Sequence, residues 1–238
     1  MNIYNKYYIN LDRSKERKLF MENLYDNITR IEGYDGKKLH EYNDIIISNN
    51  YVENPGQIGC SLSHIKAIIH SYKNGDKGAL ILEDDISNEY LSKWDKSIEE
   101  IILNSPEDCE CIQLFCSNIK RVKEMIKMKN DYYRWKKGGW GTCCYYINEK
   151  GMKKIYDLYY KEGKIDLTIN IDNYYADDSI LYTQVITYHY TKPLFINKLF
   201  ESTIMKLDCS LNIYNYITNY FKNKNNNDNK NINFTMIK

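Results

Sequence analysis

Apolar and polar positions follow two different periods along the chain, and the change of period predicts helices and strands in turn. Residues 78–82 (GALIL) are short and continuously apolar, which suits a central strand covered on both faces. Just before them, apolar residues recur at helical spacing from residue 58 to residue 72 and form one stripe. The turn Asn74-Gly75-Asp76 ends this helix. The two segments together predict an amphipathic helix packed against a sheet.

The remaining segments continue this alternation. We expect further strands at 4–11, 28–31, 111–115, 142–147 and within 185–196, and further helices at 14–24, 91–103 and 149–160. Residues 41–56 look irregular, and residues 164–182 fit neither period. Alternating strands and helices predict an α/β fold with a mainly parallel sheet and helices on both faces. We place this single domain at residues 1–210, followed by a polar Asn/Lys-rich tail at 211–238 that we expect to be partly disordered.

Composition narrows the class of protein. The chain has 238 residues, enough for one domain with a sizeable core. Its formal net charge of +1 favours neither nucleic acid nor an anionic membrane as a partner. No apolar run approaches the roughly 20 residues that a membrane span needs, and the N-terminus does not resemble a secretory signal. The seven cysteines include no CxxC pair, so we expect reduced, packed thiols and a cytoplasmic location.

Three consecutive acidic residues are the first candidate for chemistry. Glu83-Asp84-Asp85 follows the predicted strand at 78–82, and ligands of open α/β sheets bind beyond the carboxyl ends of strands. Adjacent carboxylates repel one another unless a cation or solvent relieves them. Their hard oxygens suit Mn²⁺ or Mg²⁺, which bind carboxylates together with substrate phosphates. The alternative is a solvated acidic turn that caps the next helix, and the triplet alone does not decide between the two.

The start of the helix after residue 55 is the second candidate. Gly56 and Gly59 permit close backbone approach, and the free N–H groups of a helix start favour anions. Ser61, Ser63 and His64 add polar groups near this end. From the chemistry of these residues alone, a capped helix with a satisfied surface histidine is the better interpretation. The sequence contains no GxSxG, GxxxxGK[ST] or GxGxxG motif. It therefore gives no support for a lipase-type, P-loop or dinucleotide-binding site.

Taken in order, the motifs of the chain resemble glycosyltransferase family 25, the lipooligosaccharide and procollagen galactosyltransferase group. The matching segments are YYINLDRSKERK, GYDGKKL, GQIGCSLSHIKA, ALILEDDI, WGTCCYYINEKGMKKI, KIDLTI, PLFI and FESTI. They run from about Tyr7 to about Ile204 in the order that the family shows. Each motif is weak alone, but their order is specific. The resemblance favours the metal-site interpretation of the acidic triplet.

The resemblance implies a GT-A fold, a UDP-sugar donor, Mn²⁺ or Mg²⁺ as cofactor and inversion at the anomeric carbon. It implies that Glu83, Asp84 and Asp85 hold the metal and the ribose–diphosphate end of the donor, with Asp85 the first choice as direct ligand. The positions that match the other donor-binding motifs are Asn10, Asp12, Arg13, Arg17, Gln57, Gly59, Ser61 and His64. Trp140 and Thr142 would lie on the sugar or acceptor side.

Inverting transfer needs a carboxylate that accepts the proton of the attacking hydroxyl. Asp166 matches the family's late aspartate and is the first candidate for this base, ahead of Asp172. Asp177 and Asp178 are further alternatives, and Asp166 could instead cap a helix that begins at Leu167.

The acceptor implied by the resemblance is a hydroxyl of a glycan or of a protein, such as hydroxylysine. Two other classes stay open: a non-catalytic nucleotide-sugar-binding module, and a metal-dependent phosphoryl or nucleotidyl enzyme. Cys143 and Cys144 stand where the family often has aromatic or apolar residues. The 24 tyrosines and three prolines are typical of an AT-rich genome, and our hypothesis for the source is a large DNA virus. The enzyme would then act in the host cytoplasm or the virion.

Overall fold

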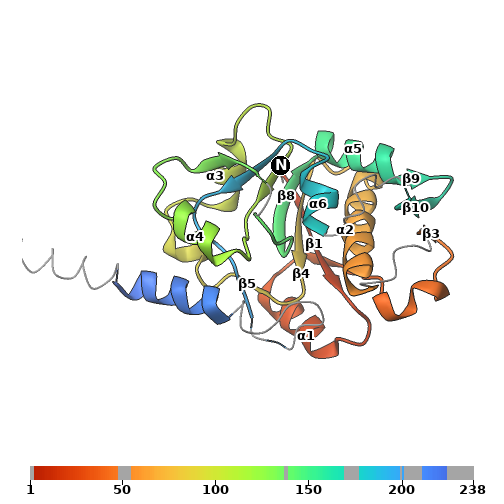
Figure 1. Cartoon of the computed structure of the whole chain (residues 1–238), viewed down its shortest axis with the longest axis horizontal. Helices are drawn as coiled ribbons and strands as arrows, with labels where there is room; N and C mark the ends of the chain where they lie inside the picture. Colours follow the sequence, from red (N-terminus) through yellow and green to blue (C-terminus); the bar gives the residue numbers. More distant parts are fainter. Residues whose placement is uncertain are drawn as a thin grey trace, which may run out of the picture.

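The centre of the molecule is a seven-stranded sheet (Figure 1). The computed structural model describes residues 3–47, 55–136, 139–168, 177–198, 200 and 211–223. Across the sheet the strands are β2 (Ile28–Glu32), β1 (Asn5–Asn10), β4 (Gly78–Glu83), β8 (Cys144–Asn148), β6 (Cys111–Gln113), β11 (Thr187–Tyr190) and β7 (Tyr132–Arg134). β8 and β7 run antiparallel to their neighbours, and the other strands run in one direction. The sheet is therefore mainly parallel, as predicted.

Helices cover both faces of this sheet. Along β4, Ala79 and Ile81 point into one hydrophobic cluster, whereas Leu80 and Leu82 point into another. The first cluster is closed by α2 (Pro55–Lys73), α5 (Glu149–Tyr159) and α6 (Asp177–Tyr182), of which α2 and α5 lie side by side (Figure 1). The second is closed by α1 (Lys15–Leu24) and α3 (Ile98–Leu103). Because successive side chains of a strand point to opposite faces, β4 has to be apolar throughout.

Smaller elements surround the central sheet. β5 (Ile86–Ser87) pairs with β12 (Ile196–Asn197), just beyond the end of β4. A separate three-stranded sheet joins β3 (Ile45–Ile46), β10 (Lys164–Asp166) and β9 (Tyr160–Lys161), and lies on the opposite side of α2 from β4 (Figure 1). Further elements are the 3-10 helices η1 (Gly36–Glu41) and η3 (Leu91–Lys93) and the helix α4 (Ile119–Met125).

The helix predicted at 91–103 is wrong in its first half. The segment begins as the short η3, then breaks, and α3 starts only after Ser97. The Ser97 side chain accepts a hydrogen bond from the Glu100 backbone at 3.2 Å, and the Glu100 carboxylate accepts one from the Ser97 backbone at 2.7 Å. This reciprocal capping box satisfies two N–H groups at a new helix start, which favours the break.

A helix at residues 211–223 continues the packed structure beyond the domain boundary predicted at residue 210. Ile213, Ile217 and Phe221 are buried at four-residue spacing and join a third hydrophobic cluster. Phe221 stacks on Tyr90 with 5.0 Å between the ring centroids. The polar composition of the segment concealed this apolar stripe, because only one side of the helix is buried. Residues 224–238 lie outside the described part of the chain.

The composition led us to expect reduced cysteines and no membrane span. The six cysteines among the described residues form no disulfide, and all except the half-buried Cys60 are buried. Within the same described ranges, every helix is too short or too polar to cross a membrane.

The packing of α2 against the sheet leads to a prediction about stability. Leu62 on α2 is fully buried, whereas Leu103 at the end of α3 is 72% exposed. Leu62→Ala should lower the free energy of unfolding by about 2–5 kcal/mol, because it leaves a cavity. The matched change Leu103→Ala should alter it by less than about 0.5 kcal/mol. Urea denaturation followed by circular dichroism measures both, and equal losses would contradict the described packing of α2.

Candidate active site

Polar side chains gather at the edge of the sheet where β1 and β4 end. β1 ends at Asn10 and β4 at Glu83. β8 runs the other way, so Thr142 and Cys143, just before its first residue, lie at this same edge. The Glu83 backbone N–H donates to the Cys143 carbonyl at 2.8 Å, which fixes the two segments together. The edge therefore collects residues that are far apart in the sequence.

Asp84 is held by β1 and α1. Asn10, only 1% exposed, donates from Nδ2 to Asp84 Oδ2 at 2.7 Å. Arg17 Nη1 donates to Asp84 Oδ1 at 2.8 Å and to Asp85 Oδ2 at 3.3 Å. Arg30 donates to Asn10 Oδ1 at 2.9 Å, so the Asn10 amide can only point its NH₂ group at Asp84. Burial raises the pKa of Asp84, and Arg17 and Asn10 oppose that shift.

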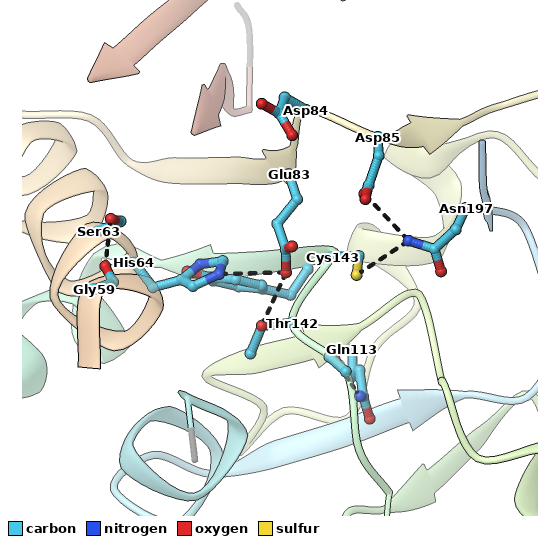
Figure 2. A network of polar contacts seen from close by, with 12 residues as sticks. Gly59, Ser63, His64, Glu83, Asp84, Asp85, Gln113, Thr142, Cys143 and Asn197 are labelled. Atoms are coloured by element: carbon cyan, nitrogen blue, oxygen red, sulfur yellow. Dashed lines mark hydrogen bonds and ion pairs between the residues drawn. The ribbon is translucent and has the colours of Figure 1, made fainter. Parts of the chain in front are cut away.

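Glu83 points to the other side, towards α2 (Figure 2). Its Oε1 accepts a hydrogen bond from Thr142 Oγ1 at 3.1 Å and lies 3.5 Å from His64 Nε2. The other ring nitrogen of His64 lies 3.1 Å from the Tyr145 hydroxyl. Burial opposes ionisation of Glu83, but its contacts with His64, Cys143 and Thr142 outweigh burial and lower its pKa. Glu83 is therefore a fixed negative charge at the sheet edge.

Asp85 faces a third direction, towards β12 (Figure 2). Asn197 donates from Nδ2 to Asp85 Oδ1 at 3.1 Å, and the same Nδ2 lies 3.5 Å from Cys143 Sγ. The pKa of Asp85 is raised to about 7, mainly by burial and secondly by the negative charge of Glu83. Two neighbouring carboxylates thus carry more negative charge than the surrounding protein compensates.

The residues present suit a divalent cation. Ligand atoms of Glu83, Asp85 and Cys143 all lie within 4.8 Å of one another. A cation between the two carboxylates would stabilise the ionised form of Asp85, which burial and then the charge of Glu83 disfavour. Carboxylate oxygens are the ligands that Mn²⁺ and Mg²⁺ prefer, and these ions complete their coordination with water and substrate phosphate. Asp84, held by Arg17, does not belong to this group of ligand atoms.

A cleft of about 330 Å³ opens beside Glu83 and Asp84. Pockets of roughly this size and above hold small molecules and cofactors. The charged side chains that line it are Arg13, Arg17, Lys37, Asp35, Glu83 and Asp84. Apolar groups such as Ile9, Leu11 and Tyr34 line it as well. Cations and an apolar wall next to a carboxylate pair suit a ligand with a ring at one end and phosphates at the other.

One face of α2 lines the cleft. Besides Pro55, its first residue, the lining residues are Gly56, Cys60, Ser63 and His64. Residues spaced by four, seven and eight lie on the same side of a helix. The predicted Gln57 and Ser61 follow one position later, about 100° around the helix, and are not among the lining residues. The role of Gln57 and Ser61 in donor binding therefore stays a prediction.

Gly59, which the family resemblance assigned to donor binding, lies against the backbone of Tyr34 and Gly36. A Cβ at Gly59 would lie 2.6 Å from the Tyr34 carbonyl oxygen and 2.8 Å from the Gly36 N atom. The glycine therefore lets α2 pack against the turn that leads into η1, and it faces that turn.

The turn after β1 contains two predicted donor-binding residues, Asp12 and Arg13. Arg13 lines the cleft and pairs with Asp35. Asp12 is exposed and pairs with Arg30 at 2.6 Å, away from the cleft lining.

Trp140 lies at the same end of β8 but outside the cleft lining. Its side chain is 56% exposed, whereas the backbone beside it is tightly held. Gly141, with a φ of +112°, presents its carbonyl to Gln113 Nε2 at 2.6 Å and to the Tyr182 hydroxyl at 3.0 Å. Thr142, next in the chain, is fully buried against Glu83. A rigid peptide thus presents an exposed aromatic ring near the acidic edge.

The structure does not bring Asp166 to the acidic edge. Asp166 ends β10, in the small sheet on the opposite side of α2 from β4 (Figure 1). Its Oδ1 accepts hydrogen bonds from the Thr168 backbone at 2.8 Å and the Thr168 hydroxyl at 2.6 Å, as in an Asx turn. Pairing of β10 with β3 fixes this position. Asp172 lies outside the described residues, and of Asp177 and Asp178 only the backbone is described.

Comparison with known proteins identifies the class. The profile of glycosyltransferase family 25, the LPS biosynthesis proteins, matches residues 3–180, which is well over half of the chain. The chain therefore belongs to this family, and the predicted family resemblance is confirmed. With the family shown, the mainly parallel sheet with helices on both faces is a GT-A-type fold. No curated protein matches the chain.

Among solved structures, the chain is similar to a glycosyltransferase involved in the glycosylation of the major capsid of PBCV-1. The two share 10% sequence identity with a TM-score of 0.47, and the match covers 89% of this chain and 98% of the other. A likeness this distant says nothing about the substrates of this chain.

Ser63 was named near the helix start but was not assigned to donor binding, and Asn197 was not named at all. Ser63 lines the cleft, accepts from the Tyr34 backbone at 2.8 Å and donates to the Gly59 carbonyl at 2.5 Å. The helical spacing of Ser63 from Gly56 could have identified it. Asn197 could not have been found in this way, because it meets Asp85 across 112 positions of the chain.

The pKa of Asp85 predicts how stability depends on pH. A carboxyl with a folded-state pKa of about 7 and an ordinary value of 3.8 stabilises the fold while it is protonated. This contribution is present below pH 3.8 and is lost as the pH rises through about 7. In metal-free buffer with a chelator, Asp85→Asn should therefore become more stable than the unmodified chain as the pH rises. The expected gain is on the order of a few kcal/mol, because one pKa unit is about 1.4 kcal/mol.

Urea denaturation at about pH 4 and about pH 8 measures this difference. Asp26, which is exposed, gives the control Asp26→Asn, and the control should follow the unmodified chain at both pH values. If the stability of Asp85→Asn relative to the unmodified chain did not change with pH, Asp85 would not be the titrating group.

Proposed function

We propose that this glycosyltransferase moves a hexose, galactose or glucose, from a UDP-sugar to a hydroxyl of a glycan or protein. The transfer inverts the anomeric carbon and uses Mn²⁺ or Mg²⁺. The observation that carries the proposal is the position of Glu83 and Asp85, a close carboxylate pair beside a cleft with cationic and apolar walls. Family membership supports the transfer of a sugar.

The charges around the cleft suit a nucleoside diphosphate. Arg13, Arg17 and Lys37 place positive charge where the two phosphates would lie. Arg17 also bonds Asp84 and Asp85, so its guanidinium links the phosphate side of the cleft to the metal-binding edge. When bound, the divalent ion neutralises the charge that develops on the diphosphate leaving group.

The apolar part of the cleft suits the nucleoside. Tyr34 is 3% exposed, and its backbone N–H is already taken by the Ser63 hydroxyl. Ile9 and Leu11 complete this wall at the end of β1. A base and ribose against these groups would place the diphosphate towards Arg17 and the sugar towards Thr142. The exposed Trp140 then lies on the side where the acceptor approaches.

Asp166 is the proposed base, with Asp172 as the first alternative. The base must come within hydrogen-bond reach of the acceptor hydroxyl during attack. Because β10 lies on the other side of α2, Asp166 can reach an acceptor at the acidic edge only if β10 moves. The same placement favours a second candidate function, a nucleotide-sugar-binding module without transfer.

Donor binding should depend on the metal and on Asp85. Calorimetric titration with a panel of UDP- and GDP-sugars should detect one UDP-sugar that binds with Mn²⁺ and loses affinity in EDTA. Asp85→Asn should weaken that binding by roughly tenfold or more, equal to about 1.4 kcal/mol, because a metal ligand is removed. The exposed control Asp26→Asn should bind as the unmodified chain does. Absence of binding by any nucleotide sugar would refute the proposed donor site.

Transfer should depend on Asp166 without a change in donor affinity. Loss of a general base typically costs 10²–10⁴ in rate, so Asp166→Asn should lower turnover by about that factor. Sugar release into product, measured with the identified donor and an acceptor panel, gives the rate, and calorimetry gives the affinity. Asp157 is exposed and paired with Lys153, so Asp157→Asn is a suitable control. Full turnover in Asp166→Asn would move the base to Asp172, Asp177 or Asp178.

A further inference from the structure

We propose that Cys60, His64 and Glu83 form a second metal site, one that takes Zn²⁺ at the wall of the donor cleft. Ligand atoms of these three residues lie within 4.8 Å of one another, and all three line the cleft. Cys60 and His64 are four residues apart on α2, so both side chains lie on the same face of that helix. Glu83 completes the set from the end of β4.

His64 supplies the observation that points to a ligand. The side chain is 2% exposed, and within the described residues its Nε2 has no hydrogen-bond partner. Nε2 lies 3.5 Å from Glu83 Oε1, longer than the usual 2.7–3.2 Å of an N–H···O bond. Zinc–nitrogen and zinc–oxygen bonds of about 2.0–2.2 Å in a tetrahedral site separate the two ligand atoms by about 3.3–3.5 Å. The observed distance therefore suits two ligands of one ion.

The surroundings of His64 support this geometry. The Tyr145 hydroxyl lies 3.1 Å from Nδ1, and such a contact to the other ring nitrogen orients a metal-binding histidine. Thr142 likewise holds Glu83 through a 3.1 Å hydrogen bond to Oε1. Two of the three ligands are thus positioned by buried side chains before any ion arrives.

The chemistry of the ligands selects the ion. A thiolate, an imidazole and a carboxylate suit Zn²⁺, whereas Mg²⁺ and Mn²⁺ prefer oxygen ligands alone. On binding, the Cys60 thiol releases its proton to solvent and the sulfur donates to the metal. Three protein ligands leave a fourth position, and because all three line the cleft, water or a phosphate oxygen would complete the coordination.

Such a site would work against the donor site, a consequence that rests on the proposed function. Glu83 belongs to both ligand groups, the one with Asp85 and the one with Cys60. Zinc bound by Cys60 and His64 would engage the Glu83 carboxylate and occupy part of the cleft. We therefore expect Zn²⁺ to weaken Mn²⁺-dependent donor binding, which makes the site inhibitory.

Cobalt reports on the proposed sulfur ligand. Co²⁺ replaces Zn²⁺ in such sites, and a thiolate ligand gives a sulfur-to-cobalt charge-transfer band in the near ultraviolet. The purified full chain should show this band, and Zn²⁺ should abolish it. Cys60→Ser should lose the band and bind Zn²⁺ roughly tenfold or more weakly, by competition with a chromophoric chelator. Cys143→Ser, which removes the thiol of the other ligand group, should keep the band.

The outcomes are distinct. No band in the unmodified chain, a band that persists in Cys60→Ser, or a band lost in Cys143→Ser would each overturn the proposal. Circular dichroism checks the fold of each variant, and Cys60→Ala serves in place of Cys60→Ser if the serine variant is unfolded.

A second arm tests inhibition. Zn²⁺ should lower donor affinity several-fold in the unmodified chain. In Cys60→Ser the affinities with and without Zn²⁺ should be nearly equal. If Zn²⁺ left the donor affinity of both proteins unchanged, the inhibitory effect would be overturned. The cobalt band requires no donor, so failure of donor binding leaves the test of the zinc site intact.

Discussion

Strand β4 lies between β1 and β8, and each face of the strand is covered by a different hydrophobic cluster. A strand in this position cannot carry a charge along its length, because a buried charge without a partner is costly. Its first charged residue comes where the strand leaves the core, at Glu83. Asp84 and Asp85 follow at once, so three carboxylates meet at one edge. The arrangement of the surrounding polar groups follows from the need to separate and balance these charges.

The structure meets this need by turning the carboxylates in three directions (Figure 2). Asp84 is balanced by Arg17 and by the buried amide of Asn10. Glu83 is directed at His64 on α2, and Asp85 at Asn197 on β12. The Arg17 guanidinium lies closer to Asp84, at 2.8 Å, than to Asp85, at 3.3 Å. A divalent cation can offset the remaining negative charge of Glu83 and Asp85, and the proposed metal site rests on this charge.

Much of the fold could be predicted because its pattern is local. The apolar run before Glu83 and the stripe along α2 each lie within one segment, so the sequence predicts a strand and a helix there. The break before α3 was missed because a capping box at Ser97 interrupts a segment whose apolar pattern continues. The helix at 211–223 was missed because a polar composition hides one buried stripe. On α2, the phase of the helix decided that Ser63 rather than Ser61 lines the cleft.

By itself, the sequence determined the family, the α/β architecture and the location of the acidic edge. Each depends on motifs or periodicities within short stretches of chain, where the backbone period alone sets which side chains share a face. Only the tertiary structure decided which groups meet the three carboxylates. The contacts of Asp85 with Asn197 and of Glu83 with Thr142 span 112 and 59 positions. Such contacts depend on the order and direction of strands in the sheet, and no local pattern of residues encodes that order.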